Sequence, residues 1–241
     1  MKLFALIGHP LGHSFSKAYF TEKFKREKLD ACYENYDLES IELLPQLIEQ
    51  RPDLCGFNVT IPYKEAILPY LDEIDPEAEA VGAVNTVKVM ADGKLVGFNT
   101  DIIGIEVCLG PVIASALILG TGGASKAVQY VLKKRHLPYY LVSQDPHKGN
   151  FTYETLTPEV IQSHLLIINA TPVGMAPHIN EAPAIPYEAI TSQHILFDLI
   201  YNPEETLFLR NGREHGATTM NGLAMLHAQA EASWMIWNPS L

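Results

Sequence analysis

"LILGTGGAS", residues 117–125, is an apolar run that enters a turn with three glycines and continues into a small residue and a hydroxyl. A strand that ends in such a turn and leads into a helix is typical of dinucleotide-binding sheets. Gly120 suits the tight exit from the strand, and Gly122 lets the backbone approach a pyrophosphate at the helix N-terminus. Ser125 occupies the sixth position, where the pattern has glycine or alanine. On these residues alone, the alternative of a glycine-rich turn without a ligand therefore stays open.

The segments around this turn predict a doubly wound α/β sheet. Short apolar stretches recur along the second half of the chain, and they are typical of strands buried on both faces. The expected strands cover residues 115–120, 139–143, 165–170, 194–200 and 217–220, with helices at 124–135 and before Gly216. The apolar stretch 222–237 predicts a final helix, which either closes this sheet or returns to the first half of the chain.

The first half of the chain alternates strands and helices up to about residue 100. Strands are expected at 3–8, 32–38 and 55–60, and helices at 17–28, 40–50 and 63–71. Helices between strands imply crossover connections and a mainly parallel sheet. Residues 85–101 instead predict two strands around the Asp92–Gly93 pair, which suits a tight hairpin turn. We therefore expect two α/β lobes that join near residues 102–114, the first with a mixed sheet.

Composition excludes several classes of partner. The 241 residues are 47% hydrophobic, and 17 basic against 28 acidic side chains give a net charge of −11. This charge argues against nucleic acid and anionic membranes as partners, and no apolar run approaches the ~20 residues that span a bilayer. Cys32, Cys55 and Cys108 are odd in number and form no CxxC pair, which favours reduced thiols and a cytoplasmic chain. The histidines form no HExxH motif, so no metal site is expected.

Polar side chains gather where strands of the first half meet turns. They lie in "GHSFSK" (12–17), "GFNVTIPYKE" (56–65), "GAVNT" (82–86) and "GFNTDIIG" (97–104). The carboxyl ends of parallel strands are where ligands sit in this architecture, so several such stretches at one edge favour a binding site. The alternative is that the hydroxyls and Asn58 merely cap helices and that Lys64 is a solvated surface lysine.

Two of these residues suit hydride transfer to or from an alcohol carbon. Lys64 and Asp101 would supply the proton donor and acceptor that the alcohol oxygen requires. Ser14 and Ser16, two residues apart after a strand, would bind a carboxylate through their hydroxyls. These residues indicate a class of reaction without identifying its substrate.

Together the motifs resemble those of the shikimate dehydrogenase family. The resemblance also covers "LGTGGASKAV" (119–128), "NATPVGM" (169–175), "DLIYNPEETLFL" (198–209) and "NGLAMLHAQA" (221–230), and so it extends over most of the chain. It implies the reversible reduction of 3-dehydroshikimate to shikimate by NADPH, in aromatic amino-acid biosynthesis.

The resemblance also implies roles for individual residues. Lys64 and Asp101 would be the catalytic pair. The substrate would be bound by Ser14, Ser16, Asn58, Thr60, Asn85, Tyr201 and Gln229. NADP would be surrounded by Gly120, Thr121, Gly122, Gly123, Ala124, Ser125, Ser143, Gln144, Asp145, Thr171, Leu199 and Gly222. These roles imply a substrate-binding catalytic domain at 1–101, joined by the C-terminal helix at 223–241, and a Rossmann-like NADP-binding domain at 102–222.

The chain departs from the family pattern at three places. Lys17 replaces the proline that commonly follows the second serine, and the linker between Asp101 and Gly120 is shorter than usual. Gln144 replaces an arginine whose charge-assisted hydrogen bonds to a 2′-phosphate glutamine cannot reproduce. Asp145 would bond a ribose hydroxyl and favours NAD, whereas Lys126 and Lys148 partly restore positive potential. We expect NADP as the cofactor, with NAD as the alternative.

Two other functions fit the same residues. One is a quinate/shikimate dehydrogenase of broader specificity that uses NAD, which Gln144 and Asp145 suggest. The other is a ligand-binding sensor without catalysis, which predicts loss of Lys64 or Asp101, and both are present. In each case we expect a small-molecule ligand and a chain that acts as a monomer or a homodimer.

Overall fold

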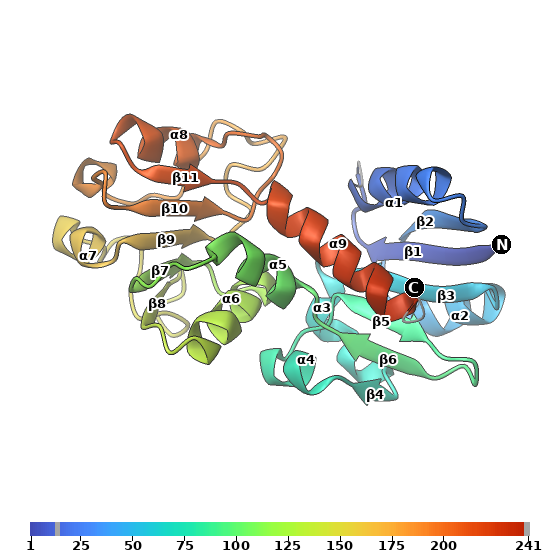
Figure 1. The fold of residues 1–241 in the computed structure, drawn as a ribbon. Coiled ribbons are helices and arrows are strands. Elements are labelled where there is room, and N and C mark those ends of the chain that lie inside the picture. Colours follow the sequence, from blue (N-terminus) through green and yellow to red (C-terminus); the bar gives the residue numbers. More distant parts are fainter. Residues whose placement is uncertain (13–14, 239–241) are drawn as a thin grey trace. The chain divides into compact units, whose positions relative to one another are not determined.

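The chain folds into two compact units (Figure 1). The structure is a computed structural model, and it describes residues 1–12 and 15–238. Unit 1 comprises Met1–Thr100 and the C-terminal residues from Ala230, and unit 2 comprises Asp101–Gln229. Each unit has a sheet and a hydrophobic core of its own.

Unit 1 contains a mixed six-stranded sheet in the order β2-β1-β3-β5-β6-β4. Its strands are β1 (Lys2–Gly8), β2 (Ala31–Asp37), β3 (Leu54–Val59), β4 (Glu73–Ile74), β5 (Thr86–Val89) and β6 (Leu95–Phe98). The first three strands are parallel, whereas β5 is antiparallel to both β3 and β6. Gly93 has a φ of +86° in the turn between β5 and β6, a conformation that glycine adopts at no steric cost. The expected hairpin and mixed sheet are confirmed.

The helices of unit 1 differ from the expectation at several places, and the helix expected at 40–50 begins as a short 3-10 helix. They are α1 (Phe15–Arg26), η1 (Ile41–Leu43), α2 (Leu44–Gln50), α3 (Tyr63–Ala66), η2 (Leu68–Tyr70) and α4 (Pro76–Val81). The single helix expected at 63–71 is split, because Pro69 has no N–H and its ring crowds the preceding turn. The helix α4 was not expected, although Asp75 caps it by accepting a hydrogen bond from Glu77 N (2.9 Å) ahead of Pro76.

The last helix, α9 (Leu223–Trp237), returns to unit 1, as the fold prediction requires. Trp234 and Trp237 pack among the aromatic rings of Phe4, Phe20, Phe24 and Tyr33. Trp237 also donates a hydrogen bond from Nε1 to Val87 O (2.9 Å). Any side chain at Gly56 would overlap the Trp237 indole, so the strand lies close to the helix only because that residue is glycine.

Unit 2 contains five parallel strands in the order β11-β10-β9-β7-β8. The strands are β7 (Ala116–Leu119), β8 (Tyr139–Val142), β9 (Leu166–Asn169), β10 (Ile195–Asp198) and β11 (Thr218–Met220). The helices are α5 (Asp101–Leu109), α6 (Gly123–Lys134), α7 (Pro158–Ser163), η3 (Tyr187–Ala189) and α8 (Leu207–Glu214). All residues of β7 and β9 are buried, which confirms the doubly wound sheet. The strand order reverses between β7 and β9, where such sheets bind ligands.

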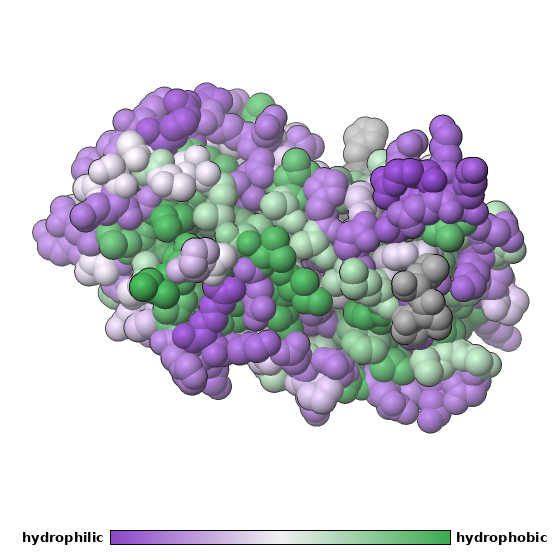
Figure 2. Space-filling view, viewed as in Figure 1, coloured by the Kyte–Doolittle hydropathy of each residue, from purple (hydrophilic) through white to green (hydrophobic). Residues whose placement is uncertain are grey.

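The helix α1 has a hydrophilic outer face and an apolar inner face. Figure 2 shows hydrophilic side chains gathered over α1, whose inner face buries Phe20 and Phe24. All three cysteines carry free thiols. In the part of the chain that the structure describes, no helix combines the length and apolar character needed to cross a membrane.

Candidate functional site

The carboxyl edge of the sheet in unit 1 brings together most of the residues predicted to bind substrate there. Asn58 lies in β3, directly opposite Thr86, and Asn85 immediately precedes β5. Thr60 follows β3, and Lys64 is the second residue of α3. Ser16 is the second residue of α1, and its side chain is hydrogen-bonded to Tyr33. Ser14, the other serine predicted to bind the carboxylate, lies outside the described residues.

Asn58 is the centre of a buried polar network. Its Oδ1 accepts a hydrogen bond from the Tyr33 hydroxyl (2.8 Å). Its Nδ2 donates toward the Asn85 carbonyl (3.2 Å), Thr86 Oγ1 (3.1 Å) and Ser233 Oγ (3.0 Å). The Asn58 side chain is 8% exposed, so the fold fixes both its position and its orientation.

Asn85 extends this network toward the start of unit 2. Its Oδ1 accepts hydrogen bonds from Thr100 N (2.7 Å) and Thr100 Oγ1 (3.2 Å). Asp101, the next residue along the chain, begins α5 and is 3% exposed. A helix N-terminus favours a negative charge, which suits a carboxylate in the catalytic pair.

The space for the Thr60 side chain depends on the absence of a side chain at a neighbouring residue. A Cβ atom at Gly8 would overlap Thr60 Cγ2. The backbone N–H of Thr60 donates to Ile7 O (2.9 Å), which ties the end of β3 to β1. Glycine at the end of β1 therefore leaves room for the Thr60 side chain at this edge.

The glycine turn of unit 2 lies at the point where the strand order reverses. Gly120 has a φ of +102°, and a Cβ there would lie 2.8 Å from Thr171 Cγ2. Gly122 is the N-cap residue of α6, and it provides no side-chain hydrogen bond to the helix. A Cβ at Gly122 would meet nothing within 4 Å. The first N–H groups of α6 and the open space at Gly122 thus suit an anionic group.

The strand β8 ends at the residues expected to meet the ribose of the cofactor. Ser143 is buried, and its Oγ accepts a hydrogen bond from Asp145 N (3.1 Å), whereas Gln144 is exposed. Asp145 Oδ1 accepts a hydrogen bond from His147 N (2.9 Å), and its Oδ2 lies 3.7 Å from Lys148 Nζ. The Asp145 carboxylate therefore stabilises the turn and has a lysine as its counter-charge, which reduces its repulsion of a phosphate.

The remaining residues predicted to surround the cofactor also lie near the carboxyl ends of strands in unit 2. Thr171 follows β9, and its Oγ1 donates to Asn169 Oδ1 (2.6 Å). Leu199 follows β10, and a Cβ at Gly222 would overlap the Leu199 carbonyl oxygen. The close approach of these two backbones requires glycine at residue 222. Tyr201 and Gln229, which were predicted to bind substrate, also belong to unit 2 and are half-buried.

Asp198 is a buried acid to which the sequence motifs gave no role. It accepts hydrogen bonds from Thr206 Oγ1 (2.6 Å), Asn169 Nδ2 (3.0 Å) and Ile200 N (3.0 Å). Burial nevertheless outweighs these donors and raises the pKa of Asp198 to about 6. The sequence signal that could have identified Asp198 is its place in the "DLIYNP" motif. The network joins the ends of β9 and β10 beside Thr171.

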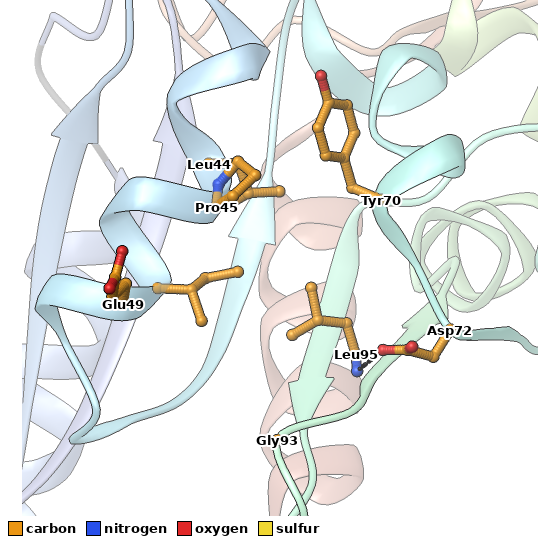
Figure 3. A pocket seen from close by; sticks show the side chains of 8 residues that line it. Leu44, Pro45, Glu49, Tyr70, Asp72, Gly93 and Leu95 are labelled. Atoms are coloured by element: carbon orange, nitrogen blue, oxygen red, sulfur yellow. Dashed lines mark hydrogen bonds between the residues drawn. The ribbon is translucent and has the colours of Figure 1, made fainter.

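A pocket of ≈ 340 Å³ in unit 1 lies away from these residues (Figure 3). It is lined by Leu44, Pro45, Ile48, Glu49, Tyr70, Asp72, Gly93 and Leu95. Leu95 pairs with Val89, at the far end of the hairpin from the Thr86–Phe98 pair beside Asn58. Asp72 accepts a hydrogen bond from Leu95 N (2.8 Å), so its carboxylate stabilises the start of β6. The pocket therefore contains none of the predicted site residues.

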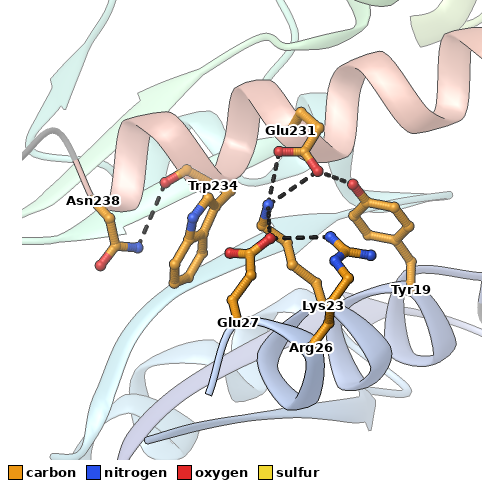
Figure 4. Close-up of polar contacts among 7 residues, drawn as sticks. All are labelled: Tyr19, Lys23, Arg26, Glu27, Glu231, Trp234 and Asn238. Carbon is orange, nitrogen blue, oxygen red and sulfur yellow. Dashed lines mark hydrogen bonds and ion pairs between the residues drawn. The ribbon is translucent and has the colours of Figure 1, made fainter. Parts of the chain in front are cut away.

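The helix α9 is fastened to α1 by a group of polar contacts (Figure 4). Lys23, which is 5% exposed, forms ion pairs with Glu231 (2.9 Å) and Glu27 (3.0 Å). Burial alone would raise the pKa of Glu231, but hydrogen bonds from Tyr19 and Lys23 outweigh it and hold that pKa below its usual range. These contacts fix the part of α9 that carries Ser233 into the network around Asn58.

Comparison with known proteins gives a consistent result. Residues 6–87 match the family model for the shikimate dehydrogenase substrate binding domain. A shikimate dehydrogenase (NADP(+)) from Methanococcus maripaludis is 39% identical over 260 residues, which cover 98% of this chain and 91% of that relative.

Solved structures agree along the whole chain. The shikimate 5-dehydrogenase from Thermus thermophilus, in complex with NADP(H) and shikimate, superposes with a TM-score of 0.89 at 34% identity, covering 100% of this chain and 95% of that one. A quinate dehydrogenase from Corynebacterium glutamicum in complex with NAD gives a TM-score of 0.88 at 27% identity, covering 99% of this chain and 94% of that one.

Proposed function

The chain belongs to the shikimate dehydrogenase family, and from this premise we propose that unit 1 binds the substrate and unit 2 binds the cofactor. The activity is the NADP-dependent, reversible reduction of 3-dehydroshikimate to shikimate, an oxidoreductase reaction at a CH–OH group. The NAD-dependent quinate alternative is less favoured, because the quinate dehydrogenase is less similar in sequence than the NADP-dependent relative. A ligand-binding sensor without catalysis is less favoured because Lys64 and Asp101 are both present.

The observation that carries the cofactor assignment is the glycine turn at the reversal of strand order. Gly122 leaves open space at the N-terminus of α6, where an L side chain would project. A pyrophosphate in that space would accept hydrogen bonds from the first N–H groups of the helix. Asp145 has Lys148 as its counter-charge, so the turn after β8 tolerates the 2′-phosphate of NADP even though Gln144 replaces the arginine.

The substrate assignment depends on the carboxyl edge of the sheet in unit 1. Hydroxyls of Ser14, Ser16 and Thr60 are donors for a carboxylate or a ring hydroxyl, and Asn58 and Asn85 offer amide groups. Asn58, Asn85 and Ser16 belong to one hydrogen-bonded network that includes Tyr33 and Thr100. This network holds the amides in place before substrate binds, which limits the entropy lost on binding. Tyr201 and Gln229 would complete the set of substrate contacts.

The proposed mechanism assigns the proton to Lys64. When bound, NADPH would supply the hydride that reduces the ketone carbon. Lys64 Nζ donates a proton to the ketone oxygen during reduction and accepts it back during oxidation of the alcohol. Asp101, buried at the start of α5, supplies the carboxylate of the pair.

Replacement of Lys64 tests this mechanism. In Lys64→Ala we expect shikimate turnover to fall by about two orders of magnitude or more, while shikimate still binds, because a proton-transfer group is lost. Single-turnover oxidation and equilibrium binding of shikimate would measure the two effects separately. Lys94→Ala is the matched control, since Lys94 is an exposed lysine of the same unit that pairs with Glu73. Unchanged turnover in Lys64→Ala would remove this residue from the mechanism.

A side-by-side assay with NADP and NAD tests the reaction, the substrate and the cofactor together. We expect shikimate oxidation with NADP to be faster than with NAD, and faster than quinate oxidation with either cofactor. Equal turnover of quinate and shikimate with NAD would support the broader dehydrogenase instead. We further propose that the enzyme is cytoplasmic and acts as a monomer or a homodimer, and light scattering on the purified chain would distinguish the two states.

A further inference from the structure

Tyr33 links two residues that are proposed to bind opposite ends of the substrate. Its hydroxyl donates a hydrogen bond to Asn58 Oδ1 (2.8 Å), and its oxygen is hydrogen-bonded to the Ser16 side chain. Tyr33 lies in β2 and is 3% exposed, so solvent does not compete for these bonds. No sequence motif marks this residue. The hydroxyl is therefore a direct bridge between a proposed carboxylate ligand and a proposed hydroxyl ligand.

The amide of Asn58 has only one orientation that fits its neighbours. Its nitrogen faces the Asn85 carbonyl at 3.2 Å, and a carbonyl can only accept hydrogen bonds. Reversing the amide would place two acceptor oxygens against each other at that distance in a buried environment, which is costly. Thr86 and Ser233 hold the same nitrogen. The Asn58 carbonyl oxygen must consequently face Tyr33.

The ring of Tyr33 is fixed as firmly as the amide. It stacks on Phe20, with ring centroids 4.8 Å apart and planes inclined by 12°. Burial raises the pKa of Tyr33, so the hydroxyl keeps its hydrogen throughout the physiological range. The ring cannot swing away, and the one freedom left to the group is rotation of its O–H bond.

We propose that Tyr33 is a positioning residue that couples recognition of the substrate carboxylate at Ser16 to recognition of a substrate hydroxyl at Asn58. The inference rests on the proposed substrate-binding function of unit 1. Tyr33 has a single hydrogen to donate, and both Ser16 and Asn58 are within reach of it. The occupancy of one end of the site therefore determines what the other end can accept.

The coupling follows from counting hydrogen atoms. Without substrate, the Tyr33 hydrogen is donated to Asn58 Oδ1, and the Ser16 hydrogen is available to Tyr33. When Ser16 turns its hydrogen to a carboxylate, the Tyr33 hydrogen turns to the Ser16 oxygen. Asn58 Oδ1 then loses its buried donor, and a substrate hydroxyl that donates to this oxygen restores the lost hydrogen bond. Two O–H bonds rotate, and no covalent bond is made or broken.

Tyr33→Phe tests the coupling, because phenylalanine retains the stacked ring and removes only the bridging hydroxyl. We expect the KM for shikimate to rise roughly tenfold, with kcat changed by less than about threefold and NADP binding unchanged. Tyr187→Phe is the matched control. It removes a tyrosine hydroxyl that donates to a backbone carbonyl of unit 2 (Pro183 O, 2.9 Å), and it should leave the KM for shikimate unchanged.

A double-mutant cycle separates coupling from a loss of folding. In a Ser16→Ala background we expect Tyr33→Phe to raise the KM less than about twofold, since the bridge is already broken. The parent should also prefer shikimate over its methyl ester more strongly than Tyr33→Phe does. If Tyr33→Phe has the same effect with and without Ser16, or weakens acid and ester equally, the coupling is wrong. Failure of the parent to oxidise shikimate would instead refute the proposed function.

Discussion

The two candidate sites use opposite structural means. At the edge of unit 1 the proposed chemistry is carried by side chains such as Asn58 and Asn85, which are buried and hydrogen-bonded to other side chains. In the turn of unit 2 it is carried by backbone N–H groups, and the important feature of Gly120 and Gly122 is the side chain they lack. The first kind of site is damaged when atoms are removed, and the second when atoms are added. Substitutions of both kinds can therefore break or sharpen this difference.

The largest effect is expected from removing a side chain that supports unit 1. Trp237 is 6% exposed, packs on Phe4 at a centroid distance of 4.8 Å and donates a hydrogen bond to Val87 O. Its replacement by alanine should lower the free energy of unfolding by about 3–5 kcal/mol, the usual range for a buried tryptophan. Urea unfolding followed by circular dichroism would measure the loss.

The same variant examines whether the two sites are independent. The damage should concentrate on shikimate binding, because α9 carries Ser233 to the Asn58 amide. NADP affinity should stay within about threefold of the parent under conditions where the variant is folded. Trp237→Phe, which keeps a ring in the cluster, is the control and should recover part of the stability. An equal loss of NADP and shikimate binding would contradict the contrast between the units.

A half-buried acid of unit 1 and a buried acid of unit 2 are expected to respond to pH in opposite directions. The pKa of Glu231 in unit 1 is lowered, so its stabilisation is present at neutral pH and is lost as pH falls through the folded-state value. The pKa of Asp198 in unit 2 is raised from 3.8 to about 6, mainly by burial. The folded state then holds this proton more tightly than the unfolded state. The resulting stabilisation is complete below about pH 4 and is lost as pH rises to about 6.

Asp198→Asn isolates that second effect. Asparagine cannot ionise, and its amide can still satisfy Thr206, Asn169 and the backbone N–H of Ile200. Between pH 4 and pH 7 the stability of the parent relative to Asp198→Asn should fall by at most about 3 kcal/mol. Urea unfolding at several pH values would measure this difference. Glu231→Gln should show the opposite trend, and parallel pH curves for parent and Asp198→Asn would contradict the buried-acid interpretation.

The sequence was most informative where function depends on local geometry. The glycines at 120 and 122 indicated a strand, a turn and a helix N-terminus. Gly122 leaves open space at the start of the helix, whereas Gly120 has a positive φ that few other residues tolerate. The Asp92–Gly93 pair indicated the hairpin for the same reason. Where two local signals competed, the prediction was less accurate. The prediction of a single helix at 63–71 overlooked the effect of Pro69. The helix α4 was not predicted, although Asp75 and Pro76 mark its start.

The support of the substrate site could not be predicted from local patterns. Tyr33, Asn58 and Ser233 are hydrogen-bonded neighbours, yet Asn58 is separated from the other two by 25 and 175 positions in the chain. Tyr33 and Ser233 look like ordinary residues of a strand and an apolar helix. Only the pairing of strands and the return of α9 to unit 1 bring them to Asn58. The roles of the site residues themselves stay predictions, which the variants of Lys64 and Tyr33 examine.

The smallest stability effect, and the sharpest test of a site built from backbone, is expected for Gly122→Ala. Its φ of −79° and ψ of −175° are open to alanine, and the new methyl group would meet nothing within 4 Å in the free protein. Unfolding stability should therefore change by less than about 1 kcal/mol, because a weaker N-cap and a less flexible unfolded chain oppose each other. NADP affinity, measured by fluorescence titration, should nevertheless fall about tenfold or more, since the methyl group occupies the space assigned to the pyrophosphate.

Gly120→Ala supplies the contrast within the same turn. At a φ of +102°, with Thr171 Cγ2 2.8 Å from the new Cβ, this variant should lose both stability and NADP affinity. Equal losses of stability in Gly120→Ala and Gly122→Ala would mean that the space at Gly122 is not open in the folded chain. Normal NADP binding by a stable Gly122→Ala would mean that the space does not hold the cofactor. Only loss of binding without loss of stability fits a turn whose function lies in an absent side chain.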